Sequence, residues 1–287
     1  MALMMAVLFW GLSFVATKIA LQCFPPFALI FFRFLGASVF FVFLLMRTGF
    51  PALTWNAVKP LLIVAIFQPG LYFSFETIGL QYSSATKASL IIATIPIVVL
   101  LLSMIFLKER IRIINILGIV ISMLGVALLV FSSQSIDKQQ GILLGDLLIF
   151  GAVLSASIYI IMTRRLSKTF SSIQITGMQV IFGMILFFPA FLFTLPQMEW
   201  STITRDAIVA LIVLTVFATI GAFLFYNYAL TKIPAARAAV CINGVPLVTA
   251  FGAWVILGER LSLLQMFGGI IVISAVYLAN RSPAPIK

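Results

Sequence analysis

The sequence contains one apolar segment twice, at a constant separation of 150 positions. The first copy begins at residue 83 and reads SSATKASLIIATIPIVVLLLSMIFLKER. A shift of 150 aligns basic residues, prolines, acid-base pairs and glycines without a gap: Lys87 with Arg237, Pro96 with Pro246, Glu109-Arg110 with Glu259-Arg260, and Gly118 with Gly268. We therefore interpret the chain as a tandem repeat of one structural unit.

The composition places both copies in a membrane. Hydrophobic residues make up 63% of the chain and charged residues 9%, compared with about 25% charged residues in soluble domains. An apolar helix crosses about 30 Å of hydrocarbon with roughly 20 residues. Ten runs have this length, near 3–22, 26–46, 58–79, 84–106, 113–131, 144–163, 172–194, 206–229, 235–257 and 262–280. The predicted fold is an all-α membrane protein with ten transmembrane helices.

The runs divide into two halves of five. We assign residues 1–131 to the first five-helix repeat, 132–143 to a connecting loop, 144–280 to the second repeat and 281–287 to a tail. Twelve Lys and Arg residues fall on connections that are internal if the N-terminus is cytoplasmic, and five fall on the external side. This bias predicts a bacterial cytoplasmic (inner) membrane protein with both termini cytoplasmic. Because each repeat has five spans, an odd number, the second repeat enters the membrane in the opposite orientation to the first.

Several classes of protein are disfavoured by what the sequence lacks. It contains no His, its two Cys residues form no CxxC motif, and no GxxxxGK loop is present. We therefore expect no metal, no cofactor, no enzymatic activity and no ATP-driven pump. The net charge of +11 follows from membrane orientation and not from binding of nucleic acid. The expected partners are a small-molecule substrate and the lipid bilayer, with the chain a monomer or weak homodimer.

The aligned prolines are candidate hinges. Pro96 and Pro246 each fall within an expected span, where proline removes one helical hydrogen bond and frees the carbonyl four residues back. Broken helices near the midplane are common at transporter binding sites. A packing kink is the alternative for either proline alone.

Charges within spans are the strongest candidates for a binding site. Arg33 lies about eight residues into its span, which is roughly 12 Å deep at 1.5 Å per residue. Lys18 follows Trp10 and Phe14 at steps of four, so the three share one helical face. For Lys18, extension of the side chain to the membrane surface is an alternative to a binding role.

The third span has one polar face, formed by Gln68, Tyr72 and Glu76 at steps of four. Glu76 is the only acid that we place well inside a span. We favour a role as counter-ion to one of three cations, Lys18, Arg33 or Lys87. A proton site and an interfacial position are the alternatives.

The second half differs in polarity from the first. Gln179 aligns with Arg33 when Ala152 is placed on Ala6, an offset of 146. The eighth span presents Ala218, Ala222 and Tyr226 where the third presents polar residues. The expected cavity is therefore asymmetric. Five further candidates are Tyr159, Tyr226, Asn227, Arg237 and Asn243.

In combination, these motifs resemble the tandem EamA-type domains of the drug/metabolite transporter superfamily. The resemblance rests on Trp10-Gly11, Ser13-Phe14, Lys18, Arg33, LQYSSATKASLI from Leu80, the two proline spans, and the endings Lys108-Glu109-Arg110 and Gly258-Glu259-Arg260. It implies ten helices in inverted repeats, cytoplasmic termini and a central cavity lined by the first four helices of each half. The second copy departs from this pattern, with Ala156-Ser157 in place of Trp10-Gly11.

Members of that superfamily move amino acids, other metabolites or drugs, often outward. We expect a secondary transporter that works by alternating access and exports an amino acid or related metabolite, because several cations, one acid and many aromatic residues suit a partly apolar carboxylate. Export of lipophilic drugs is the alternative within transport. A channel would need a continuous polar ring, and a structural membrane protein would not need Arg33 at depth.

Overall fold

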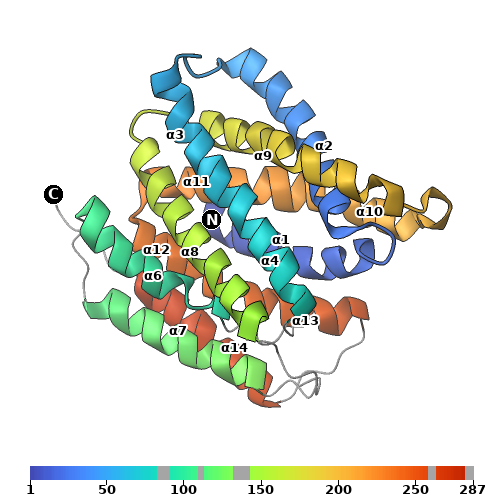
Figure 1. The fold of residues 1–287 in the computed structure, drawn as a ribbon. Coiled ribbons are helices and arrows are strands. Elements are labelled where there is room, and N and C mark those ends of the chain that lie inside the picture. Colours follow the sequence, from blue (N-terminus) through green and yellow to red (C-terminus); the bar gives the residue numbers. More distant parts are fainter. Residues whose placement is uncertain (83–90, 109–112, 132–142, 258–262, 282–287) are drawn as a thin grey trace.

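The computed structural model describes residues 1–82, 91–108, 113–131, 143–257 and 263–281 (Figure 1). The described part contains helices and no strand. In the first half the helices are α1 (Ala2–Ala20), α2 (Pro26–Thr48), α3 (Trp55–Ala65), η1 (Ile66–Leu71), α4 (Tyr72–Tyr82), α6 (Ile95–Leu102), η2 (Ser103–Leu107) and α7 (Ile113–Phe131).

The second half repeats this order. Its helices are α8 (Leu143–Leu166), α9 (Ser172–Thr194), η3 (Leu195–Gln197), η4 (Trp200–Thr202), α10 (Arg205–Val213), η5 (Leu214–Gly221), α11 (Ala222–Lys232), α12 (Ala235–Val240), η6 (Cys241–Gly244), α13 (Val245–Leu257) and α14 (Leu263–Arg281). The segments η1, η2 and η5 are π-helical turns within longer helical runs.

Six helical segments in the described residues are long and apolar enough to cross a membrane: 26–48, 55–79, 143–166, 172–197, 205–232 and 235–256. Shorter apolar helices cover 2–17, 95–107, 113–125 and 266–275. All ten segments fall on the expected runs. The all-α membrane fold is confirmed, whereas the count of ten spans stays a prediction.

Local sequence explains where several helices begin and end. Ser171 and Gln174 form a capping box at the start of α9, and the Thr204 hydroxyl accepts from the Ala207 amide at the start of α10. Pro26 occupies the first turn of α2, where its missing N–H costs nothing. Gly49 follows that helix with a φ of 98°, a conformation that favours glycine.

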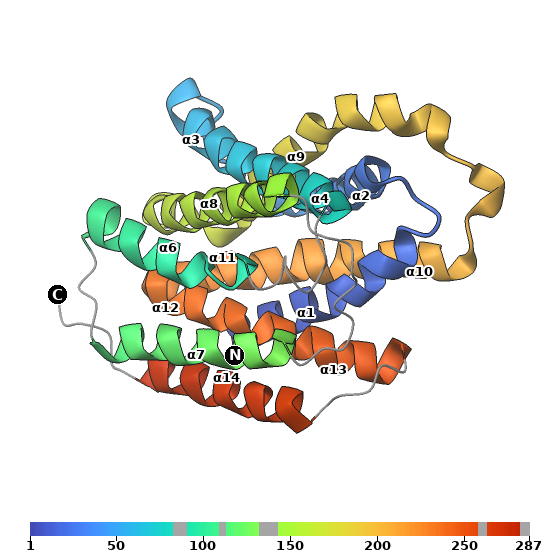
Figure 2. The same cartoon turned by 60° about the horizontal axis from the view of Figure 1, so that its bottom comes forward.

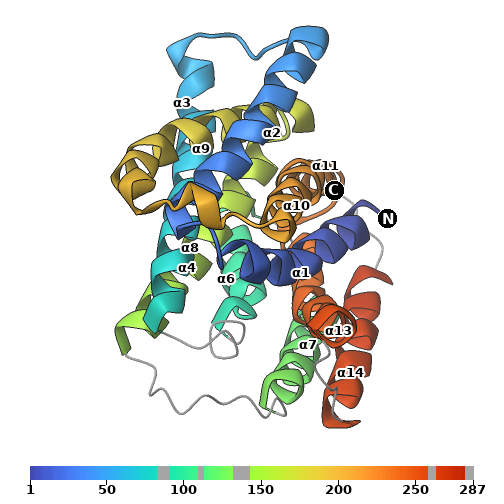
Figure 3. The ribbon, with the colours of Figure 1, turned by 90° about the vertical axis from the view of Figure 1, so that its right-hand side faces the viewer.

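The halves pack reciprocally. The run α3–η1–α4 and helix α6 pack on α8, and the run α10–η5–α11 and helix α13 pack on α1. Thus the third and fourth helical runs of each half contact the first helix of the other half. Helix α2 packs on α9, and α7 lies beside α14 at the edge of the bundle (Figure 2). Figure 3 shows α7 and α14 on the side of the bundle opposite α2 and α9.

The helical bundle has two ends, which we name after the helices found there. At the α12 end, Gln174 of α9 donates to the Gly49 carbonyl after α2, and Arg164 of α8 donates to the Leu230 carbonyl of α11. At the α4 end, a Cβ on Gly79 of α4 would meet Ile149 of α8.

The two ends differ in burial. Five of the six residues of α12 are buried, namely Ala235, Ala236, Ala238, Ala239 and Val240. In contrast, no residue from Leu71 to Ile78 along α4 is buried, on any face of the helix. A helix with lipid on one side and packed protein on the other has a buried face. Side chains are therefore more buried at the α12 end than along this stretch of α4.

Both proline spans are interrupted, as predicted, although each proline begins a new helical segment and does not kink a continuous helix. Pro96 lies in the first turn of α6, after a turn at residues 93–94. Pro246 is the second residue of α13, after the 3-10 turn η6. The missing N–H is harmless in a first turn, which explains these positions.

Candidate functional site

Arg33 lies inside the bundle, on α2, with 6% of its surface exposed. Its Nε donates to the Thr219 hydroxyl of η5 at 3.3 Å. Its guanidinium carbon is 5.4 Å from the centre of the Phe73 ring on α4. Three helical segments therefore position this charge. Two of them, α2 and α4, belong to the first half of the chain, and η5 belongs to the second half.

The end of the Arg33 side chain has unused hydrogen-bonding capacity. Among the described residues, its two terminal nitrogens have no hydrogen-bond partner, and no carboxylate oxygen lies within 4.0 Å of the guanidinium. Burying a charge with no carboxylate at contact distance is costly. The planar fork of an arginine suits bidentate binding of a carboxylate.

Glu76 lies near this fork without touching it. Tyr72, one turn earlier on α4, donates its hydroxyl to Glu76 Oε1 at 3.1 Å. Glu76 and Arg33 interact electrostatically, but they form no ion pair within 4.0 Å. Both Tyr72 and Glu76 are half-buried. Glu76 therefore interacts with Arg33 only from beyond contact distance, and one of its carboxylate oxygens has no hydrogen-bond donor among the described residues.

The predicted polar face of the third span is wrong at Gln68. A regular helix would align Gln68 with Tyr72, but Gln68 has φ −146° and ψ 114°, outside the helical region. Pro69 follows it, and the residue before a proline disfavours helical backbone angles. The Gln68 carbonyl instead accepts from Gln179 Nε2 of α9 at 3.0 Å. Its side-chain oxygen is buried without a partner among the described residues.

Four side chains on α8, α9 and α11 form a buried hydrogen-bond network, which we call the Tyr159 network: Tyr159, Thr176, Gln179 and Asn227. Asn227 Nδ2 donates to Thr176 Oγ1 at 2.9 Å and to Gln179 Oε1 at 3.1 Å. Tyr159 Oη donates to Asn227 Oδ1 at 2.5 Å. Each residue has at most 1% of its surface exposed. Because Gln179 also bonds to Gln68, the network connects second-half helices to η1 of the first half.

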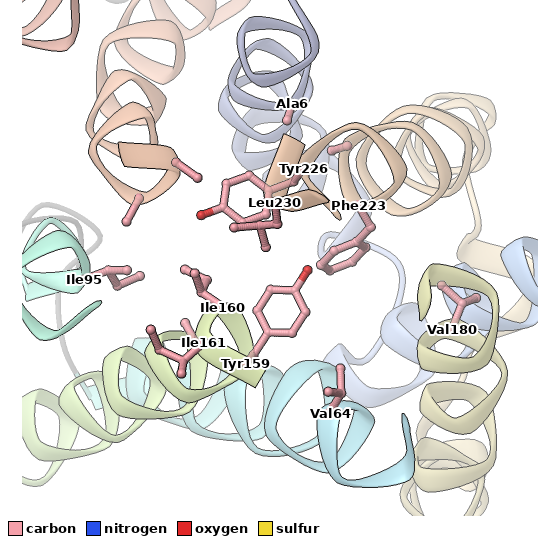
Figure 4. Packing of buried hydrophobic residues seen from close by; sticks show 14 of the residues in the cluster. Ala6, Val64, Ile95, Tyr159, Ile160, Ile161, Val180, Phe223, Tyr226 and Leu230 are labelled. Carbon is pink, nitrogen blue, oxygen red and sulfur yellow. The ribbon is translucent and has the colours of Figure 1, made fainter. Parts of the chain in front are cut away.

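An aromatic cluster of Trp10, Tyr159, Phe223 and Tyr226 shares Tyr159 with this network. The Trp10 ring centre lies 5.1 Å from that of Tyr226 and 5.6 Å from that of Phe223. Tyr159 meets Phe223 edge-on at 6.5 Å. Figure 4 shows the Tyr159, Phe223 and Tyr226 rings gathered between α8 and α11. The buried Tyr226 hydroxyl has no hydrogen-bond partner among the described residues.

The other predicted residues lie elsewhere or are not described. Asn243 of η6 donates to Ser122 of α7 at 2.7 Å, so this contact joins two helices. Arg237 lies on α12 and is half-buried. Phe14 and Lys18 belong to α1, but their side chains, like residue Lys87, lie outside the described part. The structure therefore brings together Arg33 and Glu76, and separately Trp10, Tyr159, Gln179 and Tyr226.

Sequence reasoning left several contacting residues out of the predicted site. Thr219 lies in an apolar run and aligns with Pro69, so the repeat did not mark it. Phe73 is one of 28 phenylalanines. Thr176 had only its polarity within a span as a signal, which is also typical of ordinary interhelical bonds. Asn227 was a candidate on the same signal.

Comparison with known proteins identifies the class to which this arrangement belongs. The EamA-like transporter family matches residues 1–131 and again 143–281. The chain belongs to the EamA-like transporter family. It is a multi-pass membrane transporter and not an enzyme.

Relatives of this EamA-like chain match it over nearly its full length. An uncharacterized transporter of Archaeoglobus fulgidus is 29% identical over 97% of both chains. The uncharacterized transporter YetK of Bacillus subtilis is 29% identical over 93% of this chain and 82% of its own. A solved crystal structure superposes with a TM-score of 0.81 at 16% identity, covering 97% of this chain and 95% of the other, and supports the fold.

Proposed function

We propose that this EamA-like chain is a secondary transporter that exports amino acids or related small metabolites by alternating access. The observation that most supports this proposal is the open Arg33 fork beside, but not bonded to, Glu76. A zwitterionic solute places its carboxylate on the arginine and its ammonium near the glutamate. Each charge then has a partner of opposite sign in a low-dielectric site.

The aromatic surroundings suit a solute with an apolar part. Phe73 lies against the guanidinium. On the other side, Phe223 follows Thr219 by four residues, which is about 6 Å along a helix. A solute held at Arg33 therefore extends toward Phe223 and Trp10, where aromatic side chains provide dispersion contacts.

The aromatic cluster also favours a second candidate, export of lipophilic drugs. A drug without a carboxylate would use the rings of Trp10, Phe223 and Tyr226 and would need no pairing with Arg33. Its transport would then be insensitive to loss of the arginine charge. The two candidates differ in this dependence.

We further propose that the halves are inverted five-helix repeats in a bacterial inner membrane, with cytoplasmic termini and a monomeric or weakly dimeric protein. The reciprocal packing of each half on the first helix of the other supports the inversion. In this orientation the α12 end faces the cytoplasm. Pro96 and Pro246 then act as hinges at corresponding positions of the two halves.

A two-step assay tests the function. The purified protein is first screened by thermal shift against individual L-amino acids, other small carboxylates and lipophilic cations. Compounds that stabilise it are then followed as labelled solutes in counterflow with proteoliposomes. Amino acids or related carboxylates should show protein-dependent counterflow. Counterflow of lipophilic cations alone would support the drug candidate and contradict the proposal.

A further inference from the structure

We propose that the Tyr159 network is a gate that closes the α12 end, and that its repeat counterparts Ser13, Arg33 and Thr77 close the α4 end in the opposite state. The inference rests on the proposed alternating-access function and assigns residues to its two closures. Its test measures the accessibility of side chains and needs no identified solute.

The Tyr159 network lies toward the α12 end of the bundle. Tyr159 lies in the second half of α8, within two turns of the helix end at Leu166. Asn227 is five residues before the end of α11, and Thr176 is in the second turn of α9. All three have at most 1% exposure. Helices that must separate to admit solute from the α12 end are therefore held together by these bonds.

Helix α4 differs from the Tyr159 network in burial. Glu76 and its neighbours along α4 are half-buried on every face. The side chains around Glu76 are thus less buried than the Tyr159 network, which lies toward the α12 end. Unequal burial toward the two ends is expected of a single state of an alternating-access transporter.

The repeat gives three members of the Tyr159 network polar counterparts in the first half. At the offset of 146, Tyr159 aligns with Ser13 and Gln179 with Arg33; at the offset of 150, Asn227 aligns with Thr77. When inverted repeats exchange conformations, contacts within one half break and the equivalent contacts form between the counterpart residues of the other half. Ser13, Arg33 and Thr77 are all capable of hydrogen bonding, whereas Ile30, the counterpart of Thr176 at the offset of 146, is not.

Among the described residues, the counterparts Ser13, Arg33 and Thr77 form no such network. Ser13 Oγ donates to the Trp10 carbonyl of its own helix at 2.7 Å, and Arg33 donates to Thr219. Thr77 is half-buried on α4. The first-half counterparts are thus not bonded to one another in this part of the chain, whereas the members of the Tyr159 network are. Because Arg33 belongs to both the proposed binding site and the counterpart set, a carboxylate bound there links solute binding to closure of the α4 end.

The test uses Tyr159→Phe, which removes the hydroxyl and keeps the ring. Both natural cysteines are first replaced (Cys23→Ala, Cys241→Ala), and single reporter cysteines are added at Thr163 or Ser74. Thr163 is fully buried, one turn beyond Tyr159 toward the α12 end, and Ser74 is half-buried on α4. Tyr228→Phe is the matched control, because Tyr228 is 48% exposed on the same helix as Asn227.

Loss of one buried hydrogen bond shifts an equilibrium by about fivefold. In Tyr159→Phe we expect membrane-impermeant maleimide to label Thr163→Cys about fivefold faster from the α12 side and Ser74→Cys more slowly from the α4 side. Tyr228→Phe should change neither rate. Thr176→Val, which removes one acceptor of Asn227, should shift both rates in the same directions as Tyr159→Phe.

A crosslinking arm tests the counterpart set directly. A short bifunctional thiol reagent should join Ser13→Cys to Thr77→Cys more efficiently in the Tyr159→Phe background than in its parent. Unchanged labelling and crosslinking in Tyr159→Phe would overturn the gate. Faster labelling of both reporters would also overturn it, because this pattern indicates general loosening. If the counterflow screen fails but the two reporters still shift in opposite directions, the proposed solute class is rejected and the gate is retained.

Discussion

Arg33 and Thr219 form a hydrogen bond of 3.3 Å between the second helix of one half and the π-helical turn η5 of the other. Gln179, the repeat counterpart of Arg33, makes the corresponding contact at 3.0 Å with the Gln68 carbonyl of η1. Both side chains thus donate a hydrogen bond to a π-helical turn of the other half, but they differ in charge. Gln179 is a neutral residue with its hydrogen-bonding groups in use, whereas Arg33 is a cation with open donors.

Replacing Arg33 separates a binding role from a structural one. We predict that Arg33→Ala yields a folded, membrane-inserted protein with little transport. Arg33→Lys should keep only part of the transport activity of the parent, because the ammonium is a point charge and cannot replace the bidentate guanidinium. Arg47→Ala is the matched control, since Arg47 lies on the same helix and also stacks on a phenylalanine, Phe43, at 5.0 Å. Normal counterflow in Arg33→Ala would show that Arg33 does not bind solute.

Glu76→Gln distinguishes a counter-ion from a proton carrier. We expect weaker solute binding at every pH, because Gln keeps the shape and removes the charge that interacts with Arg33. If Glu76 carries protons, the Glu76→Gln variant should instead lose solute accumulation driven by a pH gradient and keep solute exchange. Uptake driven by a pH gradient and counterflow, measured on the same proteoliposomes, separate the two. Intact exchange without pH-driven accumulation would overturn the counter-ion assignment.

Gln179→Leu should lower thermal stability. The change leaves the Gln68 carbonyl and one Asn227 proton buried without partners, at about 1–3 kcal/mol for each buried group. Melting in detergent, followed by a thiol-reactive or intrinsic fluorescence signal, measures the effect. Gln197→Leu, at an exposed position after α9, should leave the melting temperature nearly unchanged. Equal melting of the two variants would show that the network contributes little stability.

The inverted repeat predicts opposite sides for equivalent positions. A topology reporter inserted after Lys108 should report from the cytoplasm, and one after Glu259 from the periplasm, although these sites belong to the two copies of one motif. Reporter activity in cells measures both. If both are on the same side of the membrane, the inverted-repeat proposal is wrong.

The features that sequence predicted correctly depend on local chemistry or on the repeat. Hydropathy located the helices, proline positions marked the interruptions before Pro96 and Pro246, and a charge deep in a span indicated that Arg33 is enclosed. The turn η1 was missed because Pro69 aligns with Thr219 in the second half, so the repeat marked no proline break there. Thr219 was missed because its role depends on Arg33, 186 positions away.

The central claim is that the Arg33 fork binds the carboxylate of the transported solute. The most direct test compares counterflow of an amino acid selected by the screen with counterflow of its carboxamide, in the parent protein and in Arg33→Ala. The account predicts a strong preference for the acid in the parent, because only a carboxylate pairs with the fork. It also predicts loss of that preference in Arg33→Ala. Equal transport of acid and amide by the parent, or an unchanged preference in the variant, would contradict the account.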